Sequence, residues 1–309
     1  MNLEQALNDY LRIRHSLGFR LQQQGSALGN FVAFLRAQGA SFITTELALR
    51  WATQPAKVDP AQWAWRLARV RRFAIWYSAT EPRTEIPPAG LLPHRRRRKP
   101  PHIYSEEEIE RLLRHTQQLS SRKKLRWHTF TTLFGLLAAT GMRVNEVLSL
   151  DQPDVNFDQG ILHVQQTKFG KSRYVPVHPS TVEALKTYAE ARGRLFPTPP
   201  TPAFFISERG SRITGQTARY TFAKLSQQLG LRAPAKYHRR GPRLQDLRHR
   251  FAVRTLIYWY RTGLDVEREL PKLATYLGHV HVNESYWYLE AVPELLQLAT
   301  DRLIARELP

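Results

Sequence analysis

The stretch TTLFGLLAATGMRVNEVLSL at residues 131–150 carries the strongest structural signal in the chain. Its leucines recur at helical spacing and predict an apolar helix that runs towards Gly141: Leu133, Leu136 and Leu137. The Thr-Gly pair that precedes Met142 breaks this helix, and Arg143 begins the next one. Arg143 is therefore expected to project from a packed element at a helix N-terminus, where anions are favoured.

Towards the C-terminus the pattern becomes mixed. After a turn at 158–160, β-rich runs at 161–166 and 173–177 flank TKFGKS at 167–172, which predicts a hairpin, and 203–207 is a candidate third strand. Helical patterns return at 217–229, 247–260, 266–277 and 293–306. The expected fold class is mainly α with a small antiparallel β-sheet (α+β).

The charge balance indicates a polyanionic partner. The 309 residues include 46 Lys and Arg against 26 Asp and Glu, a formal net charge of +20, which attracts nucleic acid. Hydrophobic residues make up 42%, which favours a globular chain over disorder. No apolar run approaches the roughly 18 residues of a spanning helix, and the N-terminus lacks a signal-peptide pattern, so a membrane is not expected as a partner. The absence of cysteine excludes disulfides and thiolate zinc sites and fits a reducing cytoplasm.

Residues 1–80 have the pattern of a small domain of four helices. Thr44 or Thr45 is the candidate cap of the third helix, and the fourth helix begins near Pro60. Three arginines line one face of that fourth helix: Arg66, Arg69 and Arg72. Such a stripe is either a solvated face or a set of phosphate contacts.

A basic, Pro-rich linker at 81–103 follows. Five consecutive cations in it repel one another unless phosphates neutralise them: Arg95, Arg96, Arg97, Arg98 and Lys99. A strap on a nucleic-acid backbone and a merely solvated linker are the two interpretations. Ser105 and Glu108 then form a capping box that opens the larger region, 104–309.

Five separated elements of this larger region carry groups suited to phosphodiester chemistry. They are TGMRVNE at 140–146, TKFGK at 167–171, DLRH at 246–249, LGH at 277–279 and Tyr288. Fixed guanidinium groups match the extra negative charge of a phosphodiester in transfer, because they stay charged and bind phosphate in a forked manner. The tyrosine, nine residues after the histidine, supplies a phenolic oxygen as nucleophile.

Together these motifs resemble those of the tyrosine recombinase, or phage integrase, family over residues 104–309. Residues 1–80 and the basic linker are similar in size and helical character to the core-binding domain of that family. The resemblance implies a DNA-binding domain at 1–80, a linker at 81–103, and a catalytic domain with a C-terminal tail helix at 104–309. The segment around Tyr288 looks most like recombinases carried by transposons and integrative elements.

The resemblance also implies the roles of the reacting groups. Tyr288 is expected to attack the scissile phosphate and leave a 3′-phosphotyrosyl bond and a free 5′-hydroxyl, with no ATP, metal or other cofactor. Arg143 and Arg248 are expected to clamp the phosphate. A buried Tyr288 within the aromatic run Tyr286-Trp287-Tyr288 is the structural alternative.

The other motif residues have supporting roles by the same resemblance. Lys168 is the expected general acid for the 5′-oxygen, with Lys171 as the second candidate. His279 is expected to donate a hydrogen bond to the phosphate, or else to face the core. Glu146 is expected to support the fold of the site.

One position departs from the family pattern. Gln245 lies three residues before Arg248, where the family commonly has histidine or lysine. A glutamine can form hydrogen bonds but cannot exchange a proton near neutral pH. Slower catalysis, replacement by His249 or His238, and dependence on partner proteins are the alternatives.

The expected partner is double-stranded DNA in the prokaryotic cytoplasm, at the nucleoid. An amphipathic pattern at 291–303 predicts a tail helix, which either docks on a neighbouring subunit or packs on its own domain. The resemblance implies a tetramer on two DNA sites, with a second recombinase or an accessory protein as a further candidate partner. The expected activity is site-specific recombination that integrates or excises a mobile element. A type IB topoisomerase and an architectural DNA-binding protein with a degenerate site are the alternatives, the latter because of Gln245.

Overall fold

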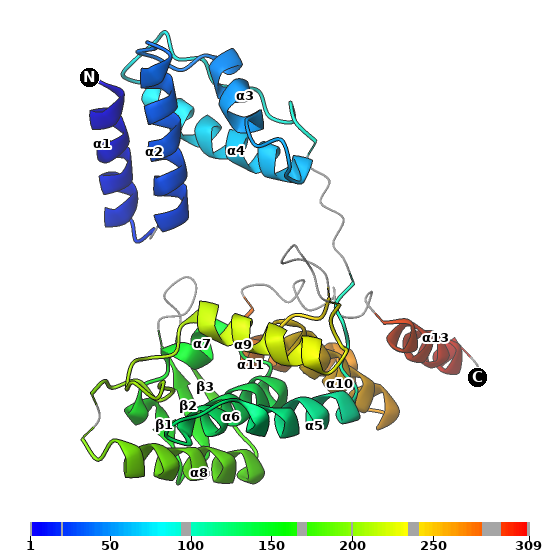
Figure 1. Ribbon diagram of the computed structural model, residues 1–309. Coiled ribbons are helices and arrows are strands. Elements are labelled where there is room, and N and C mark those ends of the chain that lie inside the picture. The colour runs from blue at the N-terminus through cyan, green and yellow to red at the C-terminus, as the bar shows by residue number, and fades with distance from the viewer. Residues whose placement is uncertain are drawn as a thin grey trace. The chain divides into compact units, whose positions relative to one another are not determined.

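The chain folds into two compact units, residues 1–99 and 100–309, each with a hydrophobic core of its own. The computed structural model describes residues 2–19, 21–93, 100–165, 172–198, 200–233, 241–279 and 292–307 (Figure 1).

Four helices build the described part of the first unit: α1 (Leu3–Ser16), α2 (Gln22–Ala37), α3 (Thr45–Thr53) and α4 (Pro60–Tyr77). The Thr44 hydroxyl caps α3 by accepting a hydrogen bond from the N–H of Leu47 at 3.2 Å. Asp59 caps α4, whose first residue is Pro60, a position where the missing N–H breaks no helical bond. The predicted helices and the predicted start of α4 are confirmed.

The first unit extends past residue 80, where the sequence predicted the linker to begin. The N–H of Glu85 donates to the carbonyl of Ile43 at 2.8 Å, and the Glu85 carboxylate accepts from the N–H of Thr45 at 2.7 Å. Leu92 packs against the core of this unit. Two of these three contacts are hydrogen bonds, and a single apolar residue shows no periodicity, so the sequence pattern did not reveal them.

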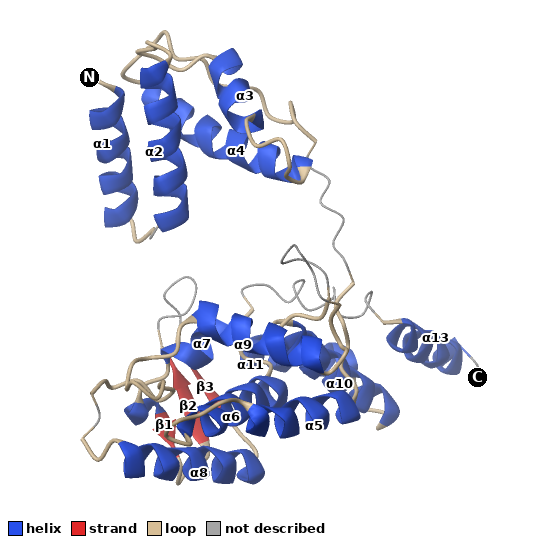
Figure 2. Ribbon diagram, in the orientation of Figure 1, coloured by secondary structure: helices blue, strands red, loops and turns tan. Residues whose placement is uncertain are grey.

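The second unit is mainly helical with one small sheet, which confirms the fold class (Figure 2). Its helices are α5 (Glu106–His115), α6 (Leu125–Thr140), α7 (Val144–Ser149), α8 (Pro179–Leu195), α9 (Gly215–Gln228), α10 (Asp246–Arg261), α11 (Val266–Leu277) and α13 (Pro293–Glu307), with short 3₁₀ turns at Thr116–Gln118 and Gln152–Asp154. Its strands are β1 (Val155–Asn156), β2 (Ile161–Val164) and β3 (Arg173–Pro176).

The strands pair antiparallel in the order β1-β2-β3, with Val155 opposite Leu162 and Leu162 opposite Val175. The two strands of the predicted hairpin are therefore confirmed, while residues 166–171 between them lie outside the described residues. The prediction of a third strand at 203–207 is wrong, because the third strand is β1. Residues 204–206 are buried without a ladder, and an apolar run of this length does not distinguish a strand from a buried loop.

Helix α8 was missing from the sequence-based prediction. Pro179 stands at its first turn, and one face buries Val182, Leu185 and Tyr188 at three-residue spacing. That spacing, together with the proline, is the signal that could have revealed it.

Helix α6 runs through the middle of the second unit (Figure 1). It ends at Thr140, directly before Gly141 and Arg143 of the predicted active site. Leu133 and Phe134 are fully buried in it, and α5, α7, α8 and α10 all contact it. The tail helix α13 packs on α10 of its own unit, where Leu295 is fully buried and Glu294 forms an ion pair with Arg261 at 2.7 Å. Among the helices of the described ranges, none is long and apolar enough to cross a membrane.

Candidate active site

The turn between α6 and α7 fixes the position of Arg143. Gly141 ends α6 with φ +61°, and a Cβ there would lie 2.7 Å from Cδ1 of Phe251, so glycine is required by both conformation and space. The chain then turns, and Arg143 becomes the residue that caps α7. Its main-chain N–H donates to Oε2 of Glu146 at 3.0 Å, which fixes the start of this short helix.

The C-terminal carbonyls of α11 bring the two predicted arginines together. The Leu277 carbonyl accepts from Nη2 of Arg248 at 2.9 Å and from Nη1 of Arg143 at 3.4 Å. The Gly278 carbonyl accepts from Nη2 of Arg143 at 3.0 Å, and the Gly141 carbonyl accepts from Nη1 of Arg248 at 2.9 Å. Carbonyls at a helix C-terminus lack partners within the helix and carry partial negative charge, so they suit guanidinium donors.

A third arginine, Arg173, belongs to the same cluster, and no sequence motif pointed to it. Its Nη2 donates to Oε2 of Glu146 at 2.8 Å, and its Nη1 donates to Oε1 at 3.2 Å. Oε1 of Glu146 also accepts from Nη1 of Arg143 at 2.8 Å. Burial raises the pKa of Glu146, but the bonds and charges of Arg173, and then those of Arg143, outweigh it and hold the pKa below its ordinary value.

His279 follows directly on these carbonyls. Gly278 takes φ +68° at the end of α11, and the N–H of His279 donates to the Ala274 carbonyl at 2.9 Å. Burial, and then the positive charges of Arg248, Arg143 and Arg173, lower the pKa of His279 to about 4 against the opposing effect of Glu146. The imidazole is therefore neutral near pH 7 and carries one ring N–H.

The residues around Gln245 divide into exposed and buried positions. Gln245 is exposed just before α10, one helical turn before the buried Arg248. His249 is buried, which lowers its pKa to about 4 although the Asp246 carboxylate opposes the shift. Arg250 donates from Nε to the Tyr104 carbonyl at 2.9 Å and pairs with Glu106, so it joins α10 to the start of α5.

Several predicted residues lie outside the described residues. They are Lys168 and Lys171 on the hairpin, Tyr288, His238, and the linker cations Arg95, Arg96, Arg97, Arg98 and Lys99.

The arginine stripe of α4 is not uniform. The Arg66 guanidinium stacks on the Trp51 ring, 3.7 Å from its centroid, and Nη2 donates to the Trp51 carbonyl at 2.7 Å. Burial, and then the charge of Arg69, lowers the pKa of Arg66. Arg69 is half-buried and Arg72 is exposed. Arg66 therefore contributes to the packing of the first unit, whereas Arg72 faces solvent.

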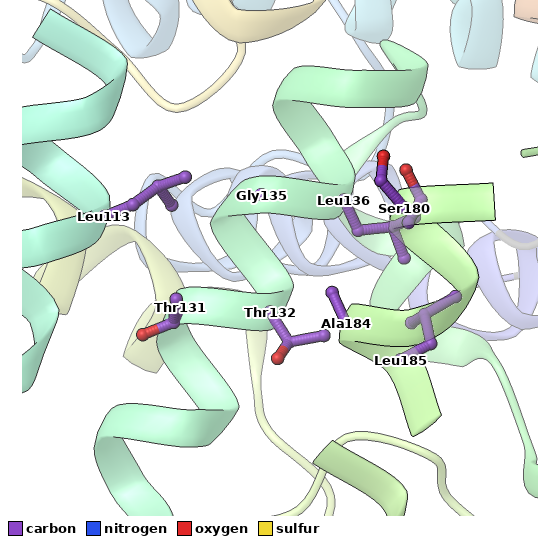
Figure 3. A pocket seen from close by; sticks show the side chains of 9 residues that line it. Leu113, Thr131, Thr132, Gly135, Leu136, Ser180, Ala184 and Leu185 are labelled. Carbon is purple, nitrogen blue, oxygen red and sulfur yellow. The ribbon is translucent and has the colours of Figure 1, made fainter. Parts of the chain in front are cut away.

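A pocket of about 190 Å³ lies apart from the arginine cluster, between α5, α6 and α8 (Figure 3). Aliphatic side chains and the hydroxyls of Thr131, Thr132, Ser180 and Thr181 line it. Its lining includes no ionisable side chain, so it offers no acid, base or phosphate clamp.

Comparisons with known proteins agree with the motifs. The model of the phage integrase family matches residues 103–294. One relative, named integrase/recombinase y4rB, comes from Sinorhizobium fredii. It is 45% identical to this chain over 306 residues, which cover 98% of this chain and 97% of the relative. Tyrosine recombinase XerD of Neisseria meningitidis is 26% identical over 295 residues, 95% of this chain and 90% of the relative.

Solved structures show the same fold. The XerH recombinase in a post-cleavage complex with its difH substrate gives a TM-score of 0.64 at 20% identity, covering 89% of this chain and 77% of that one. The Tn1549 transposon integrase in complex with circular intermediate DNA gives 0.64 at 14% identity, covering 98% of this chain and 100% of that one. Because the family model matches more than half of the chain, and a 45% identical relative aligns with nearly all of it, the chain belongs to the phage integrase family and is a tyrosine-type site-specific recombinase.

Proposed function

We propose that this recombinase cuts and rejoins double-stranded DNA through a 3′-phosphotyrosyl intermediate on Tyr288. The observation that carries the proposal is the Leu277 carbonyl shared by Arg143 and Arg248, which come from elements 105 residues apart in the sequence. Two guanidinium groups held by main-chain carbonyls form a preorganised clamp for a phosphate in transfer. Arg143, Arg248, Lys168, His279 and Tyr288 are the proposed catalytic residues.

Arg143 has donors left for a phosphate. A guanidinium carries five N–H donors, and the contacts of Arg143 use both hydrogens of Nη1 and one of Nη2. The Nε–H and the second Nη2 hydrogen remain for a ligand as far as the described residues are concerned, and the side chain is 33% exposed. These two donors suit contact with a phosphate oxygen pair.

In the proposed cleavage step, the Tyr288 hydroxyl gives up its proton to solvent, and its oxygen forms a bond to phosphorus as the bond between phosphorus and the 5′-oxygen breaks. The Lys168 ammonium gives a proton to the leaving 5′-oxygen, with Lys171 as the second candidate for this role. Neutral His279 donates its N–H to a non-bridging oxygen. Rejoining is the reverse reaction, in which a 5′-hydroxyl attacks the phosphotyrosyl bond. The exposed Gln245 is proposed to orient the phosphate or the tyrosine by hydrogen bonding, because it cannot take up the phenolic proton.

The first unit and the linker are proposed to hold the duplex through its phosphates. Arg69 and Arg72 on α4 and the cations from Arg95 to Lys99 are the proposed contacts, and Arg66 adds its charge from its place on Trp51. The net charge of +20 supports this assignment. The proposed place of action is the cytoplasm, at the nucleoid.

We propose a tetramer on two DNA sites as the active assembly, with α13 as the exchanged element. In this structure α13 lies on its own α10, and Leu296 and Ile304 on it remain 52% and 53% exposed. Transfer of α13 to the next subunit is a head-to-tail contact, and the proposed ring requires that four such contacts close. Integration or excision of a mobile element is the proposed outcome, alone or with a second recombinase or accessory protein.

Covalent trapping tests the proposal. Wild-type protein is incubated with fragmented genomic DNA of its source cell and denatured, and the DNA that stays attached is sequenced. A nicked duplex of the enriched sequence then serves as the substrate. We expect Tyr288→Phe to bind this duplex but form no adduct, while the matched control Tyr286→Phe forms it.

Other outcomes would change the assignment. An adduct with Tyr288→Phe would move the nucleophile elsewhere. Binding by wild type with no adduct on any duplex would favour an architectural role. Relaxation of supercoiled plasmid without sequence preference would favour a type IB topoisomerase.

A further inference from the structure

We propose that Arg173 is a positioning residue of the recombinase site, which holds Glu146 so that this carboxylate does not offset the charge of Arg143 towards the scissile phosphate. This inference rests on the proposed function of Arg143. Arg173 belongs to none of the motifs that indicated the family.

Arg173 contacts more of the Glu146 carboxylate than the Arg143 side chain does. Arg173 contacts both oxygens of Glu146, at 2.8 Å and 3.2 Å. The Arg143 side chain contacts one oxygen, at 2.8 Å. The Glu146 side chain is only 6% exposed, so little water competes with these contacts. A forked pair of this kind is the stronger of the two.

Arg173 is itself held in place and mostly removed from solvent. Its Nε donates to the Tyr276 carbonyl at 2.9 Å, and its side chain is 11% exposed, against 33% for Arg143. Its guanidinium lies so close to Gly278 that a Cβ on that glycine would be 2.7 Å from Nη1. Arg173 therefore acts through Glu146, whereas Arg143 is the arginine open to a ligand.

The charges of the three side chains explain why Arg173 matters. Arg143, Arg173 and Glu146 together carry one positive charge, beside the separate charge of Arg248. Without Arg173, Arg143 and Glu146 would form a neutral pair, and the field that favours a phosphate would weaken. Charge interactions in a poorly hydrated site are stronger than in water, so this loss is not screened away.

Arg173 also fixes the strand that follows the predicted lysine hairpin. It begins β3, whose Pro176 carbonyl accepts from the Tyr276 hydroxyl at 3.1 Å. The Arg173–Tyr276 bond makes a second connection, so the end of α11 and β3 are joined at two points.

The test compares single and double variants in the full-length protein on the nicked duplex found by trapping. We expect Arg173→Gln to slow adduct formation by about 10²-fold, the lower end of the effect of removing one preorganised donor. The dissociation constant for the duplex should change far less. Arg194→Gln is the matched control, because it removes the same charge at a side chain that is 78% exposed on α8, and it should cleave at the wild-type rate.

The double variant R173Q/E146Q decides between charge and packing. Removing the carboxylate together with Arg173 returns these three positions to one positive charge, so we expect R173Q/E146Q to cleave about tenfold faster than R173Q. A double variant as slow as R173Q, or slower, would overturn the proposal, because a packing role predicts further loss. Wild-type cleavage by R173Q would also overturn it.

Arg173→Lys keeps the inference testable if R173Q does not fold, as judged by its thermal melting. R173K retains the charge without the fork, and we expect its adduct rate to stay within about tenfold of wild type. A folded R173K that forms no adduct contradicts the charge mechanism. If wild type itself forms no adduct, the proposed function fails first, which distinguishes that result from a failure confined to Arg173.

Discussion

Replacing Gly278 by alanine is expected to destabilise the second unit and distort the arginine cluster. Gly278 has φ +68°, and a left-handed backbone costs a residue with a side chain roughly 1–2 kcal/mol. The new Cβ would also lie 2.7 Å from Nη1 and 2.9 Å from Cζ of Arg173. An unrestrained arginine would move aside at little cost. Arg173, however, is bonded to Tyr276 and Glu146, so overpacking adds about 1–3 kcal/mol.

The total expected loss is therefore about 2–5 kcal/mol in the free energy of unfolding. Gly263→Ala is the matched control, because Gly263 has φ +72° in the same unit and a Cβ there would meet nothing within 4 Å. It should lose only the backbone cost of about 1–2 kcal/mol. Hydrogen exchange of peptides from α10 and α11, measured against urea concentration, gives the stability of this unit separately from the first.

The adduct assay provides a second measurement. Gly278→Ala should slow cleavage, while Gly263→Ala should leave the rate at its wild-type value. Equal losses of stability in the two variants would refute the steric argument. Normal cleavage by Gly278→Ala would show that the arginine cluster tolerates the displacement.

Three further predictions follow from the site and the charge distribution. Gln245→His restores a proton-exchanging side chain one turn before Arg248 and should accelerate adduct formation by up to about 10²-fold; an unchanged or lower rate would mean that proton transfer is supplied elsewhere. The pKa of His249 and that of His279 are each lowered to about 4 in the folded chain, from an ordinary value of 6.5. Below pH 6.5 the unfolded chain therefore binds protons that the folded chain does not, and acid favours unfolding. Folding stability should be full above pH 6.5 and fall towards pH 4, by up to about 3 kcal/mol for the buried His249, and unfolding monitored against pH would contradict this if the profile were flat. Deleting residues 1–99 should weaken DNA binding and flatten its salt dependence, and an unchanged salt slope would exclude phosphate contacts by α4 and the linker.

Local signals in the sequence predicted much of the fold. The Ser105–Glu108 capping box is present, with the Ser105 hydroxyl accepting from the N–H of Glu108 at 3.1 Å. Helix α11 has the bounds predicted from its apolar spacing. These features depend on residues within a few positions of one another, which is the range over which single-sequence patterns are informative.

Features that depend on the tertiary fold could not be read in this way. The sequence indicated Arg143 and Arg248 as partners but not that one main-chain carbonyl joins them. The bond between Arg173 and Glu146 spans 27 residues and two different elements, and an arginine in a basic chain gives no sign of such a contact. Burial, rather than strand pairing, explains the apolar character of residues 203–207, so their composition alone predicts a strand wrongly.

The reliance of the arginine cluster on main-chain carbonyls makes the proposed clamp depend on helix length more than on side-chain identity at the end of α11. Leu277 contributes its carbonyl to the arginines and its side chain to the core, so another apolar residue there would keep the first contact. Deleting one residue within α11 would instead turn its last carbonyls by about 100° and shift them by about 1.5 Å. Among related chains, α11 should therefore tolerate exchanges of apolar residues but not insertions or deletions.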